Sequence, residues 1–582
     1  MQQNDPVKDP IQQNNLAKIC PTCFHENAGD ARFCTNCNKR LPGRAATQNE
    51  SPARPPDQTA SPQKPDELPV VKKVPFPKQR LQPKKGLLVL IALALALVTV
   101  SLLGVMVFKI THIPPTQSLS GGSGEVMNAN GHSIGVNDGS FAPFDVGRQD
   151  QALKQQAAAA LKGGNSAAAL SLWHQALTIN SNDAEALIYI EDQRILASGE
   201  PHITLIAGVA FTPPFPDGSS ESDLQGVYVA QHEFNTAQHG FQLRVLIANS
   251  GGNVPDTTPI AQQIVRIAKS DPTVAGVIGW RYSSCSLLAI PVLANAKIPL
   301  ISPQSTSDVL TAISPRYFFR VVAPNSEEVQ IAAPFAEKTL GFKHPVIFFD
   351  PQDSYSQNLA QGFSGQFKND GYTDIHEEPF TTDAKNQKAN FSELIQNAAQ
   401  YQPDGFIFTG RSNADSGFFQ DALPTSGPMA HINVLAGSGS YTAHKNSRGR
   451  WYFIAVAYHG ADNISSIAQQ FADDYHKDFS DSNPNHIYYY KIADDHAMVA
   501  YDATALTLKA ILNTGKTNPT SEDLARELPN MKGTKAFQGV SGQISFGSKG
   551  NPINKTLFIL FVPLSGGIQL VSVCSINAGC HK

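Results

Sequence analysis

Residues 86–108 form an uninterrupted apolar run, GLLVLIALALALVTVSLLGVMVF, which constrains this chain more than any other feature. The run contains no charged residue, and about 20 apolar residues suffice for a helix to cross a bilayer. It lacks the polar stripe of a helix packed on a soluble core. It also lies too far from the N-terminus for an ordinary signal peptide. We therefore predict a single transmembrane helix over residues 86–108.

The charges around this segment predict its orientation. Six basic residues crowd its N-terminal side, namely Lys72, Lys73, Lys78, Arg80, Lys84 and Lys85. On the other side only Lys109 lies close. Because positively charged flanks stay in the cytoplasm, residues 1–85 are expected inside the cell and residues from 109 onward outside. The overall net charge of −4 makes nucleic acid an unexpected partner.

The seven cysteines divide into groups with different chemistry. Four of them follow the pattern C-x2-C-x10-C-x2-C, namely Cys20, Cys23, Cys34 and Cys37. Two thiolate pairs brought together by a hairpin make a tetrahedral set that suits zinc, and four protein ligands make the metal structural. Residues 16–41 accordingly resemble the short zinc ribbons at the N-termini of many bacterial membrane proteins. Cys574 and Cys580 could instead form a disulfide in an oxidising compartment.

Two polar segments flank the predicted membrane helix. Residues 42–85 are rich in Pro and poor in apolar residues, which predicts a semi-rigid cytoplasmic linker. Residues 109–147 are rich in Gly, Ser and Asn, so we expect a flexible linker outside the membrane.

Residues 148–198 change to a helical pattern. Ala and Leu recur there at three- and four-residue spacing, with breaks at residues 163–165 and 180–183. The run LKGGNSAAALSLWHQALTINSNDAEALIY resembles a tetratricopeptide-type unit. Since such units gain stability by stacking, we favour a helical neck packed against the next domain over a peptide-binding array.

From residue 202 onward, short apolar runs alternate with helical stretches. The apolar runs are ITLIAGVAF, FQLRVLIA, VAGVIG, IPLIS, PVIFF, GFIFTG and INVLAG. Continuous apolar strands separated by helices are typical of parallel sheets covered on both faces. About 370 residues are too many for one such sheet, so the predicted fold class is α/β with two lobes.

Four stretches of this region resemble type I periplasmic substrate-binding proteins. ITLIAGVAFTPPFPDGSSESDLQGVYVAQHEFN looks like the opening strand, ligand loop and first helix of that family. VAGVIGWRYSSCSLLAIPVLANAKIPLISPQSTSDVL has its Ser-rich turn at a helix start. YDATALTLKAIL and FQGVSGQISFGSKGNPINKTLFIL are similar to its late helix and closing hairpin. The resemblance spans residues 202–573 and implies a two-lobed Venus-flytrap domain of the branched-chain amino acid and amide ABC importer type.

Two turns of the first lobe are the main candidates for ligand contact. Ser283 and Ser284 follow the strand VAGVIG and open a helix, whose free N–H groups can receive an anion. Three residues follow the strand IPLIS in the same way, namely Gln304, Ser305 and Thr306. In the resembled family these turns hold the backbone groups of an amino acid, although plain N-capping would also explain them.

On the second lobe, aromatic residues are the candidates. Tyr355 matches the aromatic that such proteins close over the ligand. Tyr441 and Tyr458 follow the runs INVLAG and WYFIAVA, where hinge-facing contacts are expected. Half-buried core aromatics would occupy these positions equally well.

The sequence departs from the family where an acid normally pairs with the ligand's ammonium. Near Tyr458 we find only His459 and the more distant Asp462. A buried ammonium without a partner costs several kcal/mol, so the ligand need not be a zwitterionic amino acid. Arg411, after the strand GFIFTG, could receive a carboxylate bidentately, while a solvated arginine is the default interpretation.

Catalytic motifs do not support an enzyme. The chain has no GxSxG elbow, HExxH pair, Walker loop or GxGxxG after a strand. His232, His239 and His496 are interpreted as helix-surface or satisfied positions, and the adjacent Asp494 and Asp495 as pointing to different helix faces.

Together these features predict a single-pass protein of the cell membrane with an extracytoplasmic receptor domain. It would bind a small polar solute (an amino acid, amide or carboxylate) for ABC-type import or for sensing, with a permease or another membrane protein as partner. The alternative is a scaffold or regulator of cell-envelope enzymes with the same fold, similar to the activators of penicillin-binding proteins.

Overall fold

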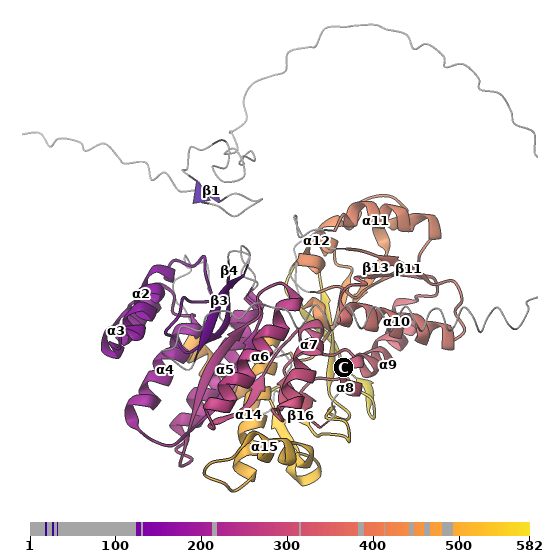
Figure 1. Cartoon of the computed structure of the whole chain (residues 1–582). Coiled ribbons are helices and arrows are strands. Elements are labelled where there is room, and N and C mark those ends of the chain that lie inside the picture. The colour runs from indigo at the N-terminus through magenta and orange to yellow at the C-terminus, as the bar shows by residue number, and fades with distance from the viewer. Residues whose placement is uncertain are drawn as a thin grey trace, which may run out of the picture. The chain divides into compact units, whose positions relative to one another are not determined.

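The structure is a computed structural model, and the part of the chain that it describes is drawn in colour in Figure 1. The described residues are 18–19, 26–27, 32, 124–129, 132–211, 218–313, 316–381, 389–411, 414–441, 447–458, 466–479 and 493–581. The chain divides into two compact units, Met1–Pro114 and Pro115–Lys582.

In the first unit, β1 (Lys18–Ile19) pairs antiparallel with β2 (Glu26–Asn27). The four predicted zinc ligands and the predicted membrane helix at residues 86–108 lie outside the described residues. Within the described ranges, no helix has both the length and the apolar character that a membrane crossing requires.

The second unit contains two lobes, of which the first is built on a seven-stranded sheet in the order β3-β4-β6-β5-β7-β8-β9. The strands are β3 (Glu125–Ala129), β4 (His132–Asn137), β5 (His202–Val209), β6 (Gln242–Asn249), β7 (Val274–Ile278), β8 (Leu300–Ser302) and β9 (Phe318–Arg320). Strands β6, β5, β7, β8 and β9 are parallel, as predicted. Leu205 and its neighbour Ile206 belong to different buried apolar clusters, so both faces of the sheet are covered.

Helices cover this sheet, and several come from the C-terminal part of the chain (Figure 1). They are α5 (Gly218–Thr236), α6 (Thr257–Ser270), α7 (Ser283–Asn295), α8 (Val309–Ile313), α13 (Ser466–Phe479), α14 (Asp495–Asn513) and α15 (Ser521–Glu527). Helices α5 and α14 pack closely. A Cβ at Gly226 would lie only 2.1 Å from the carbonyl oxygen of Ala497, so a larger residue would clash there. A short hairpin of β15 (Phe537–Gly539) and β16 (Gly542–Ile544) follows.

The second lobe has a sheet in the order β11-β10-β12-β13-β14-β17-β18-β19. Its strands are β10 (Pro345–Phe349), β11 (His376–Pro379), β12 (Gly405–Phe408), β13 (Asn433–Ala436), β14 (Trp451–Ala455), β17 (Leu557–Val562), β18 (Gln569–Ser575) and β19 (Gly579–His581). Its helices are α9 (Asn325–Phe335), α10 (Ser354–Asn369), α11 (Phe391–Ala398) and α12 (Ala414–Ala422). A disulfide joins Cys574 on β18 to Cys580 on β19, which agrees with the possible pairing of these cysteines.

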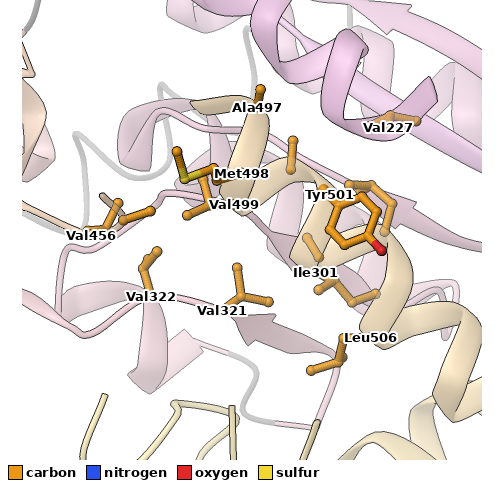
Figure 2. Close-up of a cluster of buried hydrophobic side chains, with 14 of the residues drawn as sticks. Val227, Ile301, Val321, Val322, Val456, Ala497, Met498, Val499, Tyr501 and Leu506 are labelled. Carbon is orange, nitrogen blue, oxygen red and sulfur yellow. The ribbon is translucent and has the colours of Figure 1, made fainter. Parts of the chain in front are cut away.

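The chain passes between the lobes after β9, after β14 and before β17. Figure 2 shows Val322 and Val456, which follow β9 and β14, in one apolar cluster with Met498 and Val499 of α14. All four side chains are buried. These crossings are therefore held by apolar packing.

The predicted helical neck forms α2 (Gln151–Lys162), α3 (Ser166–Ile179) and α4 (Ala184–Ser198). Helix α4 is joined to the first lobe through Asp192, which accepts hydrogen bonds from the Val245 amide (3.0 Å) and Gln231 Nε2 (2.9 Å). A buried ammonium, Lys154 Nζ, lies 2.5 Å from Asp183 Oδ2. The neck thus packs against the first lobe, and its tetratricopeptide-like character stays a prediction.

The prediction of a flexible linker over residues 109–147 is wrong for residues 125–129 and 132–137. These residues form the β3–β4 hairpin, whose second strand extends the first lobe's sheet by pairing with β6. Ile134 and Val136 alternate with small and polar residues and are buried. The Gly-, Ser- and Asn-rich composition of the segment outweighed this alternation in the prediction, although the sequence pair Asn130–Gly131 is typical of hairpin turns.

Candidate ligand-binding site

A small cavity of about 40 Å³ lies where the two lobes meet. It is lined by Arg281, Tyr282, Ser283, Gln304, Thr306 and His496 of the first lobe and by Tyr355, Arg411, Ser438 and Gly439 of the second. Most of these residues follow strands β7, β8, β10, β12 and β13 directly. Ligands of open α/β sheets bind at this carboxyl edge. The space holds a few water molecules, so a metabolite requires the lobes to part.

The first-lobe wall consists of the two predicted Ser-rich turns, which are tied together by hydroxyl groups. Ser283 is the first residue of α7, and its hydroxyl accepts a hydrogen bond from the Ser307 amide (3.2 Å). The Ser305 hydroxyl is fully buried and bonds to the Trp280 carbonyl (2.8 Å). Ser305 therefore does not line the cavity, because its side chain turns inward to join the two loops, and its predicted ligand contact stays a prediction.

The second-lobe wall is fixed by a buried acid behind it. Glu328 on α9 accepts hydrogen bonds from the Ser438 amide (2.9 Å) and hydroxyl (2.6 Å). Burial raises the pKa of Glu328 to about 7, and the bonds from Ser438 partly oppose that rise. The Tyr355 hydroxyl accepts a hydrogen bond from the Gly439 amide (2.7 Å). Tyr355 is thereby held in place between α10 and the turn after β13.

Arg411 takes part in a contact that crosses between the lobes. Its guanidinium pairs with Asp353, and its Cζ atom lies 4.4 Å from the ring centre of Tyr282. Asp353 Oδ2 also accepts a hydrogen bond from the Ser284 hydroxyl (2.9 Å). Burial alone would raise the pKa of Asp353, but the charge of Arg411 holds it below its usual value. The default interpretation of Arg411 as a solvated side chain is wrong, because this buried carboxylate pairs with it.

The second arginine of the site, Arg281, contacts His496 Nδ1 and the Gln304 side chain. Its Nη1 lies 3.7 Å from Asp223 Oδ2. Burial and the neighbouring Arg281 hold the pKa of His496 well below its usual value, so the imidazole is neutral and accepts from Arg281 through Nδ1. His496 is 6% exposed, which corrects its interpretation as a helix-surface position and agrees with a satisfied one.

The adjacent acids Asp494 and Asp495 have different partners, as expected. Asp494 caps α14 by accepting from the Ala497 amide (2.9 Å) and also bonds the Ser222 hydroxyl (2.9 Å). Asp495 Oδ2 accepts instead from Gln304 Nε2 (3.1 Å).

The cavity wall as a whole offers hydrogen-bond donors. Each lobe contributes one arginine, and none of the described residues that line the cavity is Asp or Glu. The acids Asp353 and Asp223 contact the guanidinium groups without lining the cavity. Helix α7 also begins at the wall, with its N-terminus. This arrangement suits a carboxylate, which arginine can bind bidentately.

Of the eight predicted ligand contacts, four line the cavity: Ser283, Gln304, Thr306 and Tyr355. Ser284 lies at the contact between the lobes. Tyr441 and Tyr458 instead pack their rings against Phe453 and Phe558, as the alternative of half-buried core aromatics expects. Whether the lining residues bind a solute stays a prediction. His459 and Asp462 lie outside the described residues.

Four further lining residues were not predicted from the sequence, namely Arg281, Tyr282, Ser438 and Gly439. Arg281 and Tyr282 directly precede Ser283 in a turn that was already singled out, so proximity along the chain could have indicated them. Ser438 and Gly439 follow the strand INVLAG, one turn before Tyr441. Nothing in the local pattern indicated His496.

Comparison with known proteins identifies the family to which this chain belongs. Residues 209–567 match the periplasmic binding protein family. No curated protein sequence matches the chain. Similar solved structures include the leucine-binding protein LivK of Thermotoga maritima (TM-score 0.53, 20% identity, 64% of this chain and 99% of that one). Another is the substrate-binding protein LivJ of Streptococcus pneumoniae in complex with isoleucine (TM-score 0.52, 20% identity, 64% and 99%).

A third is a solute-binding protein of an ABC transporter from R. palustris in complex with 4-hydroxybenzoate (TM-score 0.52, 16% identity, 62% and 93%). At these identities the structural likeness establishes the fold. The family match, in contrast, covers more than half of the sequence. The chain therefore belongs to the periplasmic binding protein family and has its type I, two-lobed α/β fold.

Proposed function

We propose that this protein is a membrane-anchored, extracytoplasmic solute-binding protein whose ligand is a small metabolite with a carboxylate. The observation that carries the proposal is the pair of arginines, Arg281 and Arg411, which line one cavity from opposite lobes. Such an arrangement lets the solute draw the lobes together, and the closed form would be recognised by an ABC permease or a sensor partner.

The chemistry of the wall narrows the ligand class. Among the described lining residues no acid is available to receive an ammonium group. Isoleucine and 4-hydroxybenzoate, the ligands of two structural neighbours, share a carboxylate but differ in the ammonium. We therefore favour a carboxylate without an ammonium, and the rings of Tyr282 and Tyr355 favour an apolar or aromatic body.

Isothermal titration of the detergent-purified full chain with matched solutes tests this proposal. We expect 4-hydroxybenzoate to bind and to raise the melting temperature, and 4-hydroxybenzamide, which has the same shape without the charge, to do neither. Isoleucine and its amide form a second pair that tests for a zwitterion site. Equal binding of acid and amide would contradict the role of the arginines.

A second candidate, the scaffold function, is favoured by the small volume of the cavity and by the direct hydrogen bonds between the lobes. In that case no solute would be required for a partner to bind. The absence of binding throughout a broad panel of acids, amides and amino acids would favour the scaffold over the receptor.

The membrane anchor and its orientation belong to the same proposal. The uncharged segment at residues 86–108 and its basic N-terminal flank support a single span with the N-terminus in the cytoplasm. The Cys574–Cys580 disulfide supports an oxidising environment for the C-terminal part. Protease accessibility in inverted and right-side-out vesicles tests the orientation: residues after 109 should be cleaved only from the outer side.

The zinc ribbon is proposed for residues 16–41. The pairing of Lys18 with Asn27 and of Ile19 with Glu26 supports it, because these strands flank the Cys20 and Cys23 pair as a hairpin would. Four thiolates would hold one zinc ion that stabilises this short segment. Metal analysis of the full chain should find one equivalent of zinc, and the Cys23→Ser variant should lose it.

A further inference from the structure

The contact between the lobes is made by a carboxylate of the chain itself. Asp353 lies on the second lobe just before α10, and its side chain is 4% exposed. Its Oδ2 accepts from the Ser284 hydroxyl at the start of α7 and pairs with Arg411. Arg411 is one of the two arginines that the proposed function offers to a solute's carboxylate, and Ser284 directly follows Ser283 of the cavity wall.

Further hydrogen bonds follow the same boundary between the lobes. The Ser354 amide donates to the Ser284 hydroxyl (3.1 Å), and the Ser354 and Ser307 hydroxyls lie 3.2 Å apart. The Asp308 amide donates to Asn358 Oδ1 (2.9 Å). The start of α10 thus rests against the turns that follow β7 and β8. Separation of the lobes would break these bonds together with the Ser284–Asp353 bond.

We propose that Asp353 is an internal carboxylate that latches the lobes and competes with the solute for Ser284 and Arg411. This inference rests on the proposed function and deepens it. A solute then binds tightly only when its own carboxylate displaces Asp353. Neutral and cationic solutes have no carboxylate for this exchange and are therefore excluded from the site. The rival explanation is that Asp353 only orients Arg411, in which case its removal would weaken binding.

The Asp353→Asn variant separates these explanations. Asparagine still caps α10, because its Oδ1 can accept from the Ser356 amide as Asp353 Oδ1 does at 3.0 Å. We expect 4-hydroxybenzoate to bind ~10-fold more tightly, because Arg411 loses its internal anion. The Ser284→Ala variant should instead change the affinity by less than about threefold, because it removes a donor from Asp353 in the free state and from the solute in the bound state, and these two losses oppose each other.

Asp350→Asn is the matched control. Asp350 lies in the same loop, and its Oδ1 accepts from the Gln352 amide at 2.8 Å. This substitution removes the same charge nearby but leaves the carboxylate of Asp353, the Ser284 hydroxyl and Arg411 in place, so the affinity should stay within about twofold. Weaker binding by Asp353→Asn would overturn the competition and assign Asp353 a positioning role.

A second measurement does not depend on any solute. Hydrogen exchange at the first turns of α7 and α10 should be faster in both Asp353→Asn and Ser284→Ala than in Asp350→Asn, because the latch is weakened from either side. Unchanged exchange would overturn the latch whether or not a solute binds. Faster exchange without any binding of carboxylates would instead refute the proposed function and leave the latch standing.

Discussion

The buried charge network between α2 and α4 of the neck (here the neck joint) and the boundary between the two lobes both bury charged side chains, but with opposite consequences. In the joint, Lys154 is enclosed together with Asp183 and Glu185, and each of these side chains is about 1% exposed. At the lobe boundary, Arg411 remains 30% exposed beside a cavity. An enclosed network fixes one geometry, whereas a charge pair beside a cavity can exchange its partner for a solute.

One carboxyl group from each region shows pKa shifts in opposite directions. Burial and the nearby Asp183 raise the pKa of Asp150, in the neck joint, to about 8. Asp353, in contrast, has a lowered pKa because Arg411 outweighs its burial. The joint contains more acids than bases, whereas each of the two arginines that line the cavity lies beside one acid. The same residue types therefore serve rigidity in one region and exchange in the other.

The largest expected effect concerns the neck joint. Lys154→Met would leave Asp183 and Glu185 buried without their cation, which costs ~3–5 kcal/mol of unfolding free energy. Urea unfolding of the full chain measures this loss. The exposed Lys162 at the end of α2 is the matched control, and its change to Met should cost less than about 0.5 kcal/mol. Equal effects of the two substitutions would show that the joint does not depend on its charge network.

The second prediction concerns the lobe boundary. Arg411→Gln should weaken the binding of 4-hydroxybenzoate ~30-fold or more, because truncating a buried charge partner costs about 2 kcal/mol or more. Titration calorimetry checks this loss. Arg266→Gln serves as control, since Arg266 pairs with Glu125 on an exposed surface (2.7 Å) and leaves the cavity intact. A similar loss in both variants would remove the distinction between the two kinds of ion pair.

The third prediction is a dependence of stability on pH that originates in the joint. Folded Asp150 keeps its proton up to about pH 8, whereas an unfolded Asp releases it near pH ~4. The folded state thus binds more protons between these values, and its stability falls as pH rises, by at most ~1.4 kcal/mol per pH unit. The unfolding free energy should depend less steeply on pH between 5 and 8 in Asp150→Asn.

Asp353 provides the opposite sign for comparison. Its lowered pKa stabilises the folded state above the unfolded value of about 4, and that contribution is lost as pH falls through the lowered pKa. Glu328, whose pKa is raised to about 7, contributes a slope of the same sign in this range. A slope that is unchanged in Asp150→Asn would therefore contradict the role of Asp150.

The smallest expected effect separates true wall residues from core aromatics. Tyr441→Phe should change the affinity for 4-hydroxybenzoate by less than about twofold, because the ring packs against Phe453. Tyr355→Phe should weaken binding ~5-fold, since its hydroxyl accepts from the Gly439 amide and holds the turn after β13. Comparable losses in both variants would place Tyr441 at the solute after all.

The local features of the fold were predictable from the sequence. Unbroken apolar runs such as the one ending at Ile278 indicated strands buried on both faces, and Ser283 was correctly expected at the start of a helix next to the cleft. The β3–β4 hairpin was not predicted, because two short strands in a Gly-rich segment contain few apolar residues. The correct predictions and the missed hairpin have one cause. The spacing of apolar residues along a segment indicates which of its faces are buried, so a segment with few apolar residues gives little indication.

What the sequence alone determined is the alternation of parallel strands and helices after residue 202, the two-lobed α/β class and the turns at which the cleft lies, because each depends on neighbours along the chain. Only the tertiary structure decided which charges meet. Asp353 and Arg411 are 58 residues apart in sequence, and Arg281 and His496 are 215 apart. Whether an arginine is solvated, latched or available to a solute depends on the carboxylate that the fold places beside it, because Coulomb attraction acts through space.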